Sequence, residues 1–90
     1  MEHTVYFERS NGEFVPVGGV RGPEFKARDA SFDLIKRFCF DHKYKIPYWR
    51  LYNDTANGVP MTCVDVGSHT EFFWIEPPLE DFTKGGSYDT

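Results

Sequence analysis

Residues 29–42, Asp-Ala-Ser-Phe-Asp-Leu-Ile-Lys-Arg-Phe-Cys-Phe-Asp-His, decide the fold class of this chain. Leu34, Ile35 and Phe38 recur at the spacing of one helical face, and charged side chains lie away from that face. The pattern predicts one amphipathic helix from about Asp29 to Lys43. A single helix leaves the rest of the chain to strands and turns.

The start of this helix is predicted to follow a glycine-rich connection. Residues 18–23, Gly-Gly-Val-Arg-Gly-Pro, are typical of a loop that breaks regular structure. Asp29 or Ser31 can cap the first turn, because either side-chain oxygen can accept hydrogen bonds from backbone N–H groups that lack a partner inside the helix.

Strands are predicted on both sides of the helix. Residues 4–8 and 13–17 flank Asn11-Gly12, a dipeptide that supplies the positive backbone angles of a tight hairpin. Three more strands are predicted at residues 48–53, 61–66 and 70–76, and residues 54–58 are predicted to form a second turn that ends in Asn57-Gly58. The predicted fold is α+β, a five-stranded and mainly antiparallel sheet with one amphipathic helix packed on one face, in the order β-β-α-β-β-β. Residues 1–78 form this domain, and residues 79–90 are predicted to be an acidic flexible tail.

Composition narrows the function classes. With 10 basic and 14 acidic residues, the net charge of -4 argues against a partner held mainly through phosphate contacts. Two cysteines in 90 residues do not make a disulfide framework, and no leader pattern is visible, so we expect a cytoplasmic protein with free thiols. No apolar run approaches the roughly 20 residues that span a bilayer, so no membrane association is expected.

Aromatic residues make up 18% of the chain and concentrate in the predicted strands. Successive side chains of a strand point to opposite faces of a sheet, so one set should face the helix. Its members are Val5, Phe7, Trp49, Leu51, Val64, Val66, Phe73 and Ile75. The other face should then carry a second set, which one helix cannot cover. Its members are the candidate partner-binding residues Tyr6, Tyr48, Arg50, Tyr52, Phe72 and Trp74.

This second face admits three interpretations. Tyr, Trp and Arg are enriched in protein interfaces, which favours a small protein-binding module that acts as an inhibitor, adaptor or accessory subunit, of the kind that phage and mobile-element genes encode, or a homodimer. The alternative function is a stacking platform for single-stranded nucleic acid. The third interpretation is ordinary sheet surface, because aromatic side chains also stabilise strands through cross-strand pairs.

Metal binding and catalysis are not expected. Cys39 and His42 lie one helical turn apart, and with Cys63 and His69 they include the ligand types of tetrahedral zinc. Their spacing is poor, and Cys39 sits in an apolar helix as a small core side chain would. No nucleophile, base and orienting group recur at a spacing typical of an active site, so neither an enzyme nor a cofactor is predicted.

Overall fold

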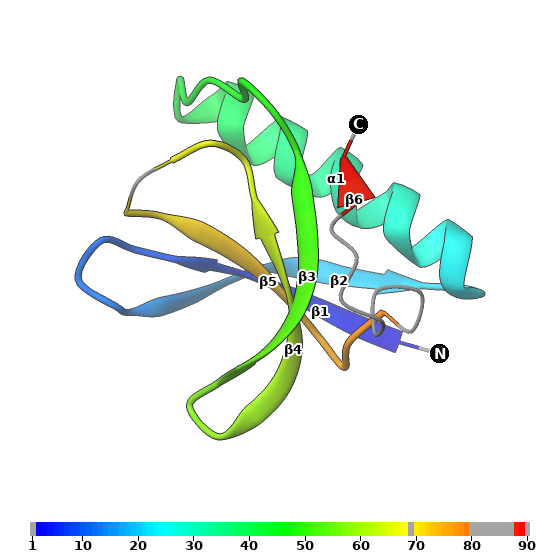
Figure 1. Cartoon of the computed structure of the whole chain (residues 1–90). Coiled ribbons are helices and arrows are strands. Elements are labelled where there is room, and N and C mark those ends of the chain that lie inside the picture. Colours follow the sequence, from blue (N-terminus) through cyan, green and yellow to red (C-terminus); the bar gives the residue numbers. More distant parts are fainter. Residues whose placement is uncertain (1, 69, 80–87, 90) are drawn as a thin grey trace.

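The computed structural model describes residues 2–68, 70–79 and 88–89 (Figure 1). Its elements are β1 (Glu2–Glu8), β2 (Phe14–Arg21), α1 (Glu24–Asp41), β3 (Arg50–Ala56), β4 (Val59–Asp65), β5 (Phe72–Glu76) and β6 (Tyr88–Asp89). Neighbouring strands pair antiparallel in the spatial order β2-β1-β5-β4-β3-β6. The predicted α+β fold is confirmed, and the two-residue β6 adds a short strand beside β3.

The first hairpin forms at the predicted Asn11-Gly12 turn. The Gly12 N–H donates to the Arg9 carbonyl at 2.8 Å, and the Arg9 N–H donates to the Glu13 carbonyl at 2.8 Å. Gly12 has a φ of +89°, a conformation that glycine adopts without steric cost. The turn thereby sets the antiparallel register of β1 and β2.

The strand β2 is longer than predicted, because Gly18 and Gly19 of the predicted loop are part of the sheet. Gly18 pairs with Val5, and the strand continues to Arg21. A Cβ atom at Gly18 would lie 3.1 Å from the Leu34 side chain of α1. Glycine here lets the helix approach the strand closely, which a sequence pattern alone does not distinguish from a flexible loop.

The helix also begins earlier than predicted, at Glu24 rather than near Asp29. Pro23 is the N-terminal cap residue in an extended conformation, and its carbonyl accepts the N–H groups of Lys26 and Ala27. Ser31 is therefore inside the helix, where its hydroxyl donates to the Ala27 carbonyl at 2.8 Å. Among the described residues, no helix is both long and apolar enough to cross a bilayer.

The second hairpin turns at Asn57-Gly58, and both residues have positive φ angles of 53° and 78°. Two such residues suffice to reverse the chain, so β3 continues through Asp54, which was assigned to the turn, as far as Ala56. At its other end β3 begins only at Arg50. Tyr48 therefore precedes the strand in which it was predicted to lie.

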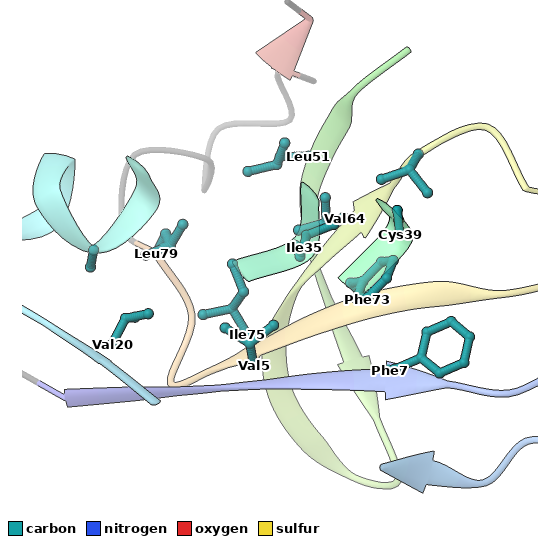
Figure 2. Close-up of a cluster of buried hydrophobic side chains, with 12 residues drawn as sticks. Val5, Phe7, Val20, Ile35, Cys39, Leu51, Val64, Phe73, Ile75 and Leu79 are labelled. Atoms are coloured by element: carbon teal, nitrogen blue, oxygen red, sulfur yellow. The ribbon is translucent and has the colours of Figure 1, made fainter. Parts of the chain in front are cut away.

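The main core lies between α1 and the sheet (Figure 2). It contains Ile35 and Cys39 of the helix together with the sheet residues predicted to face it. Those sheet residues are Val5, Phe7, Leu51, Val64, Val66, Phe73 and Ile75. Trp49, also predicted on this side, packs at the margin, where its ring stacks on Phe32 at 4.7 Å between centroids.

Leu79 belongs to this core as well, although it was predicted to open the tail. The Leu79 N–H donates to the Thr62 hydroxyl oxygen at 2.8 Å, and the Asn53 amide donates to the Leu79 carbonyl at 3.3 Å. The Thr62 hydroxyl in turn donates to the Asn53 side-chain oxygen at 2.6 Å. Polar side chains of β3 and β4 thus hold the segment that follows β5. Of the rest of the predicted tail, residues 80–87 and 90 lie outside the described residues.

Candidate functional site

The sheet face that points away from α1 carries a second apolar cluster. Ala56, Met61, Cys63 and Trp74 are its buried members, and five half-buried side chains surround them. These five are Tyr6, Phe14, Tyr52, Val59 and Phe72. We call the nine residues the outer cluster. In Figure 1, α1 lies against one face of the sheet and the β3–β4 turn extends away from it, so no described helix covers the outer cluster.

Trp74 forms the centre of the outer cluster and is only 8% exposed. Its indole Nε1 donates to the Glu8 carboxylate at 2.8 Å, and the Phe14 ring stacks beside it with centroids 5.9 Å apart. The ring of Tyr6 lies 6.2 Å from that of Phe14. The surface offered to solvent is therefore made largely by the surrounding rings, with Trp74 beneath them.

A hollow of about 360 Å³ opens beside Trp74, between the two hairpin turns. Gly12 and Phe14 line it from the β1–β2 side, and Thr55 and Asn57 line it from the β3–β4 side. Binding hot spots concentrate where a large side chain of the partner fills a pocket of this kind and displaces the water from it.

Arg50 lies at one border of the outer cluster. Its guanidinium donates to the Asp65 carboxylate at 3.0 Å and sits 5.8 Å from the centroid of the Tyr52 ring. Asp65 is buried and also accepts the Gly67 N–H at 2.9 Å. One hydrogen bond and a cation–π contact thus hold Arg50 beside Tyr52, and the Gly67 N–H in turn holds the carboxylate of Asp65.

The structure brings together four of the six candidate residues, Tyr6, Tyr52, Phe72 and Trp74, with Arg50 adjoining them. Tyr48 lies elsewhere, because it precedes β3 and is not part of the outer cluster. It is 47% exposed and lies near Gly67. The prediction continued the alternation of strand residues back to Tyr48, whereas β3 begins to pair with β4 only at Arg50.

Sequence reasoning missed five members of the outer cluster, Phe14, Ala56, Val59, Met61 and Cys63. Four of them belong to the β3–β4 hairpin. Cys63 and Trp74 are cross-strand partners in β4 and β5, so the alternation that selected Trp74 would also have selected Cys63. Phe14 had no comparable signal, because Pro16 and two glycines interrupt the alternation of β2.

Carboxylates give this face a negative rim. Burial raises the pKa of Cys63, a hydrogen bond with Tyr52 lowers it, and the negative charges of Asp65, Asp54 and Glu8 raise it; together they bring it to about 12. Burial also raises the pKa of Tyr52, next to the same thiol. Three acidic side chains therefore act on the centre of the outer cluster, where Arg50 is already paired with one of them.

The four residues considered for zinc do not form one site. Cys39 belongs to the core beneath α1, whereas Cys63 belongs to the outer cluster on the opposite face of the sheet. The His42 ring Nδ1 donates to the Phe38 carbonyl of its own helix at 2.9 Å, and His69 lies outside the described residues. Within the described part of the chain, no three His, Cys, Asp or Glu side chains are grouped to hold a metal ion.

Both thiols should resist ionisation and make stability fall at high pH. Burial raises the pKa of Cys39 to about 11 and that of Cys63 to about 12, from about 9 in an exposed thiol. Above pH 9 the unfolded chain loses these protons before the folded chain does, so the free energy of unfolding should decrease from about pH 9 toward pH 11. Urea unfolding at pH 8 and pH 10 measures the difference. The Cys39→Ala variant should show a shallower decrease, and equal pH dependence in both proteins would contradict the assignment.

Comparison with known proteins adds no relative to this description: no protein-family model, no curated protein and no solved structure matches the chain.

Proposed function

We propose that this protein is a protein-binding module and that the outer cluster is its docking surface. The observation that carries the proposal is an apolar and aromatic cluster on a sheet face that no described helix covers. Contiguous apolar patches rimmed by polar residues are typical of interaction sites, and Tyr and Trp contribute large contact areas with little loss of conformational entropy. An inhibitor, adaptor or accessory subunit would use such a surface.

Charge favours a partner with a basic surface. Glu8, Asp54 and Asp65 lie around the centre of the outer cluster, and the chain as a whole has a net charge of -4. Opposite charges at the rim of an interface accelerate association and exclude like-charged partners. The same charge weighs against a stacking platform for nucleic acid, whose phosphates would meet these carboxylates.

The hollow beside Trp74 suggests how such a partner would anchor. The apolar part of a partner side chain that enters between the hairpin turns would contact Phe14 and Trp74. The polar end of the same side chain would approach the Glu8 carboxylate. Lysine and arginine combine an apolar stem with a cationic head, so either could fill the hollow and meet the carboxylate.

Matched tyrosine variants test the proposal. The partner is captured from the native cell extract with the wild-type protein, purified, and titrated with each variant. Tyr52→Ala should weaken binding by at least about 2 kcal/mol, or roughly thirtyfold, if Tyr52 is a central contact. Tyr48→Ala is the control, because it removes an exposed tyrosine outside the outer cluster and should leave the affinity unchanged.

Three outcomes would overturn the proposal. Equal affinities of the wild-type and Tyr52→Ala proteins, both folded by circular dichroism, would make the outer cluster ordinary sheet surface. A concentration-dependent dimer that Tyr52→Ala dissociates would assign the face to a second copy of the chain. Binding of single-stranded oligonucleotides with a steep salt dependence would favour the nucleic-acid alternative.

A further inference from the structure

Two adjoining cavities lie where the C-terminal end of α1 meets β1 and β5. Their volumes are about 200 and 320 Å³, and Phe7, Tyr44 and Glu71 line both. We call the two cavities together the helix-end cleft. None of these three residues belongs to the outer cluster, so the helix-end cleft is separate from the proposed docking surface.

The helix terminus positions Tyr44 in this cleft. The Tyr44 N–H donates to the Cys39 carbonyl at 2.8 Å, and the Lys43 N–H donates to the Phe40 carbonyl at 3.2 Å. Lys43 has a φ of +61°, so the chain turns back in the left-handed conformation that ends many helices. This turn directs Tyr44 back over the last turns of α1, where its ring can close the cleft.

The walls of the helix-end cleft are apolar and aromatic. Four buried side chains line the smaller cavity: Phe7, Cys39, Val66 and Phe73. The Tyr44 ring lies 6.0 Å from the Phe7 ring and 6.4 Å from the Phe38 ring, between centroids. Figure 2 shows Phe7, Phe73 and Cys39 gathered at the same end of the main core. A ligand here would meet ring faces and a neutral thiol.

Glu71 supplies the polar group of the cleft. Its carboxylate accepts the Tyr44 hydroxyl at 3.3 Å and the Ser68 hydroxyl at 3.4 Å, both long distances for such bonds. Among the residues that the structure describes, no lysine or arginine forms an ion pair with it. The carboxylate thus lies beside the phenol of Tyr44, and burial together with the charge of Glu71 raises the pKa of Tyr44. The carboxylate therefore has acceptor capacity to offer a ligand.

Two basic side chains also border the helix-end cleft. Arg9 lines the larger cavity and pairs with Glu13 at 3.7 Å, so its charge is partly balanced. Lys45 lines the smaller cavity and is exposed. Its ammonium group can compete with a ligand for Glu71, which makes Lys45 useful as a test position.

We propose that the helix-end cleft binds an organic ammonium group with an apolar body. The cation would lie at Glu71 and against the ring faces of Tyr44 and Phe7, and the apolar body would enter the smaller cavity. A carboxylate next to aromatic faces favours such cations, because the charge–charge and cation–π attractions act on the same group. Free amines and the lysine side chain of a protein share this chemistry.

Titration with 2-phenylethylamine tests the site against its neutral analogue 2-phenylethanol. Amide chemical shifts of Cys39, Val66 and Phe73 report where each compound binds. The amine should bind at least about tenfold more tightly than the alcohol, as charge-assisted contacts exceed neutral ones. Glu71→Gln should abolish this preference, whereas Glu76→Gln, at the opposite end of β5, should retain it. Lys45→Met should strengthen binding of the amine by removing the competing cation.

Titration with Nα-acetyl-lysine amide distinguishes the source of the cation. Tighter binding of this compound than of 2-phenylethylamine would assign the cleft to a lysine side chain, and the reverse order would assign it to a free amine. Equal binding of amine and alcohol, or shifts confined to residues outside the helix-end cleft, would overturn the proposal. A Glu71→Gln protein that still binds the amine more tightly than the alcohol would also overturn the proposal. The outer cluster is unchanged in all of these variants, so a failure here leaves the proposed function standing.

Discussion

Phe73→Ala is expected to lower the free energy of unfolding by about 3 to 5 kcal/mol, the range for buried phenylalanines. Phe73 is 1% exposed in β5, where it pairs with residues of both β1 and β4. Its ring lies 5.1 Å from Phe7 and 5.6 Å from Phe38, between centroids. Truncation would therefore leave a cavity that joins the helix-end cleft, and the remaining rings could collapse only partly into it.

Chemical denaturation of the wild-type protein and the variant measures this loss. Phe40→Ala is the control, because Phe40 belongs to α1 but is 83% exposed. Its removal should change the stability by no more than about 0.5 kcal/mol, as surface substitutions usually do. Similar denaturation midpoints for Phe73→Ala and the wild-type protein would mean that Phe73 is not part of the core.

Gly67→Ala is expected to lower the free energy of unfolding by about 2 to 4 kcal/mol through steric strain. Gly67 has a φ of +95°, and a Cβ atom there would lie 2.4 Å from Cγ and 2.9 Å from Cδ of Pro47. The proline ring cannot rotate away, so the segment before β3 would have to move. Tyr48 would move with it, because its ring lies 3.4 Å from the same Cβ position.

Gly12→Ala is a matched control for this effect. Gly12 has a similar φ of +89°, but a Cβ atom there would have no neighbour within 4 Å. Alanine at position 12 should cost only the backbone strain of about 1 kcal/mol. Equal losses of stability in the two variants would show that the contact with Pro47 contributes nothing beyond the glycine conformation.

Local patterns were enough to determine the order of elements and the two faces of the sheet. The period of two in strands assigns Val5 and Phe73 to the helix side and Tyr6 and Trp74 to the other side, and the structure has all four there. This holds because alternation depends only on the pleat of each strand and not on which strand lies next to it. The Asn-Gly dipeptides determine both hairpins for a similarly local reason.

The ends of elements required tertiary context. Gly18 continues β2 because Leu34 of α1 packs closely against it, and this contact joins residues far apart in the chain. Pro23 rather than Asp29 starts the helix, since the Pro23 carbonyl already accepts the first helical N–H groups. Helix propensity alone is compatible with a start at either Pro23 or Asp29.

The candidate sites were decided by which distant strands become neighbours. The sequence identified Trp74 as an aromatic residue of the outer face, but its burial follows from pairing of β5 with β1, which brings Glu8 and Phe14 over the indole. The helix-end cleft arises in the same way, because it joins Phe7 of β1, Tyr44 after α1 and Glu71 before β5. Alternation determines on which face a side chain lies, whereas its neighbours and its exposure depend on strand order and on where the helix ends, which are long-range properties of the folded chain.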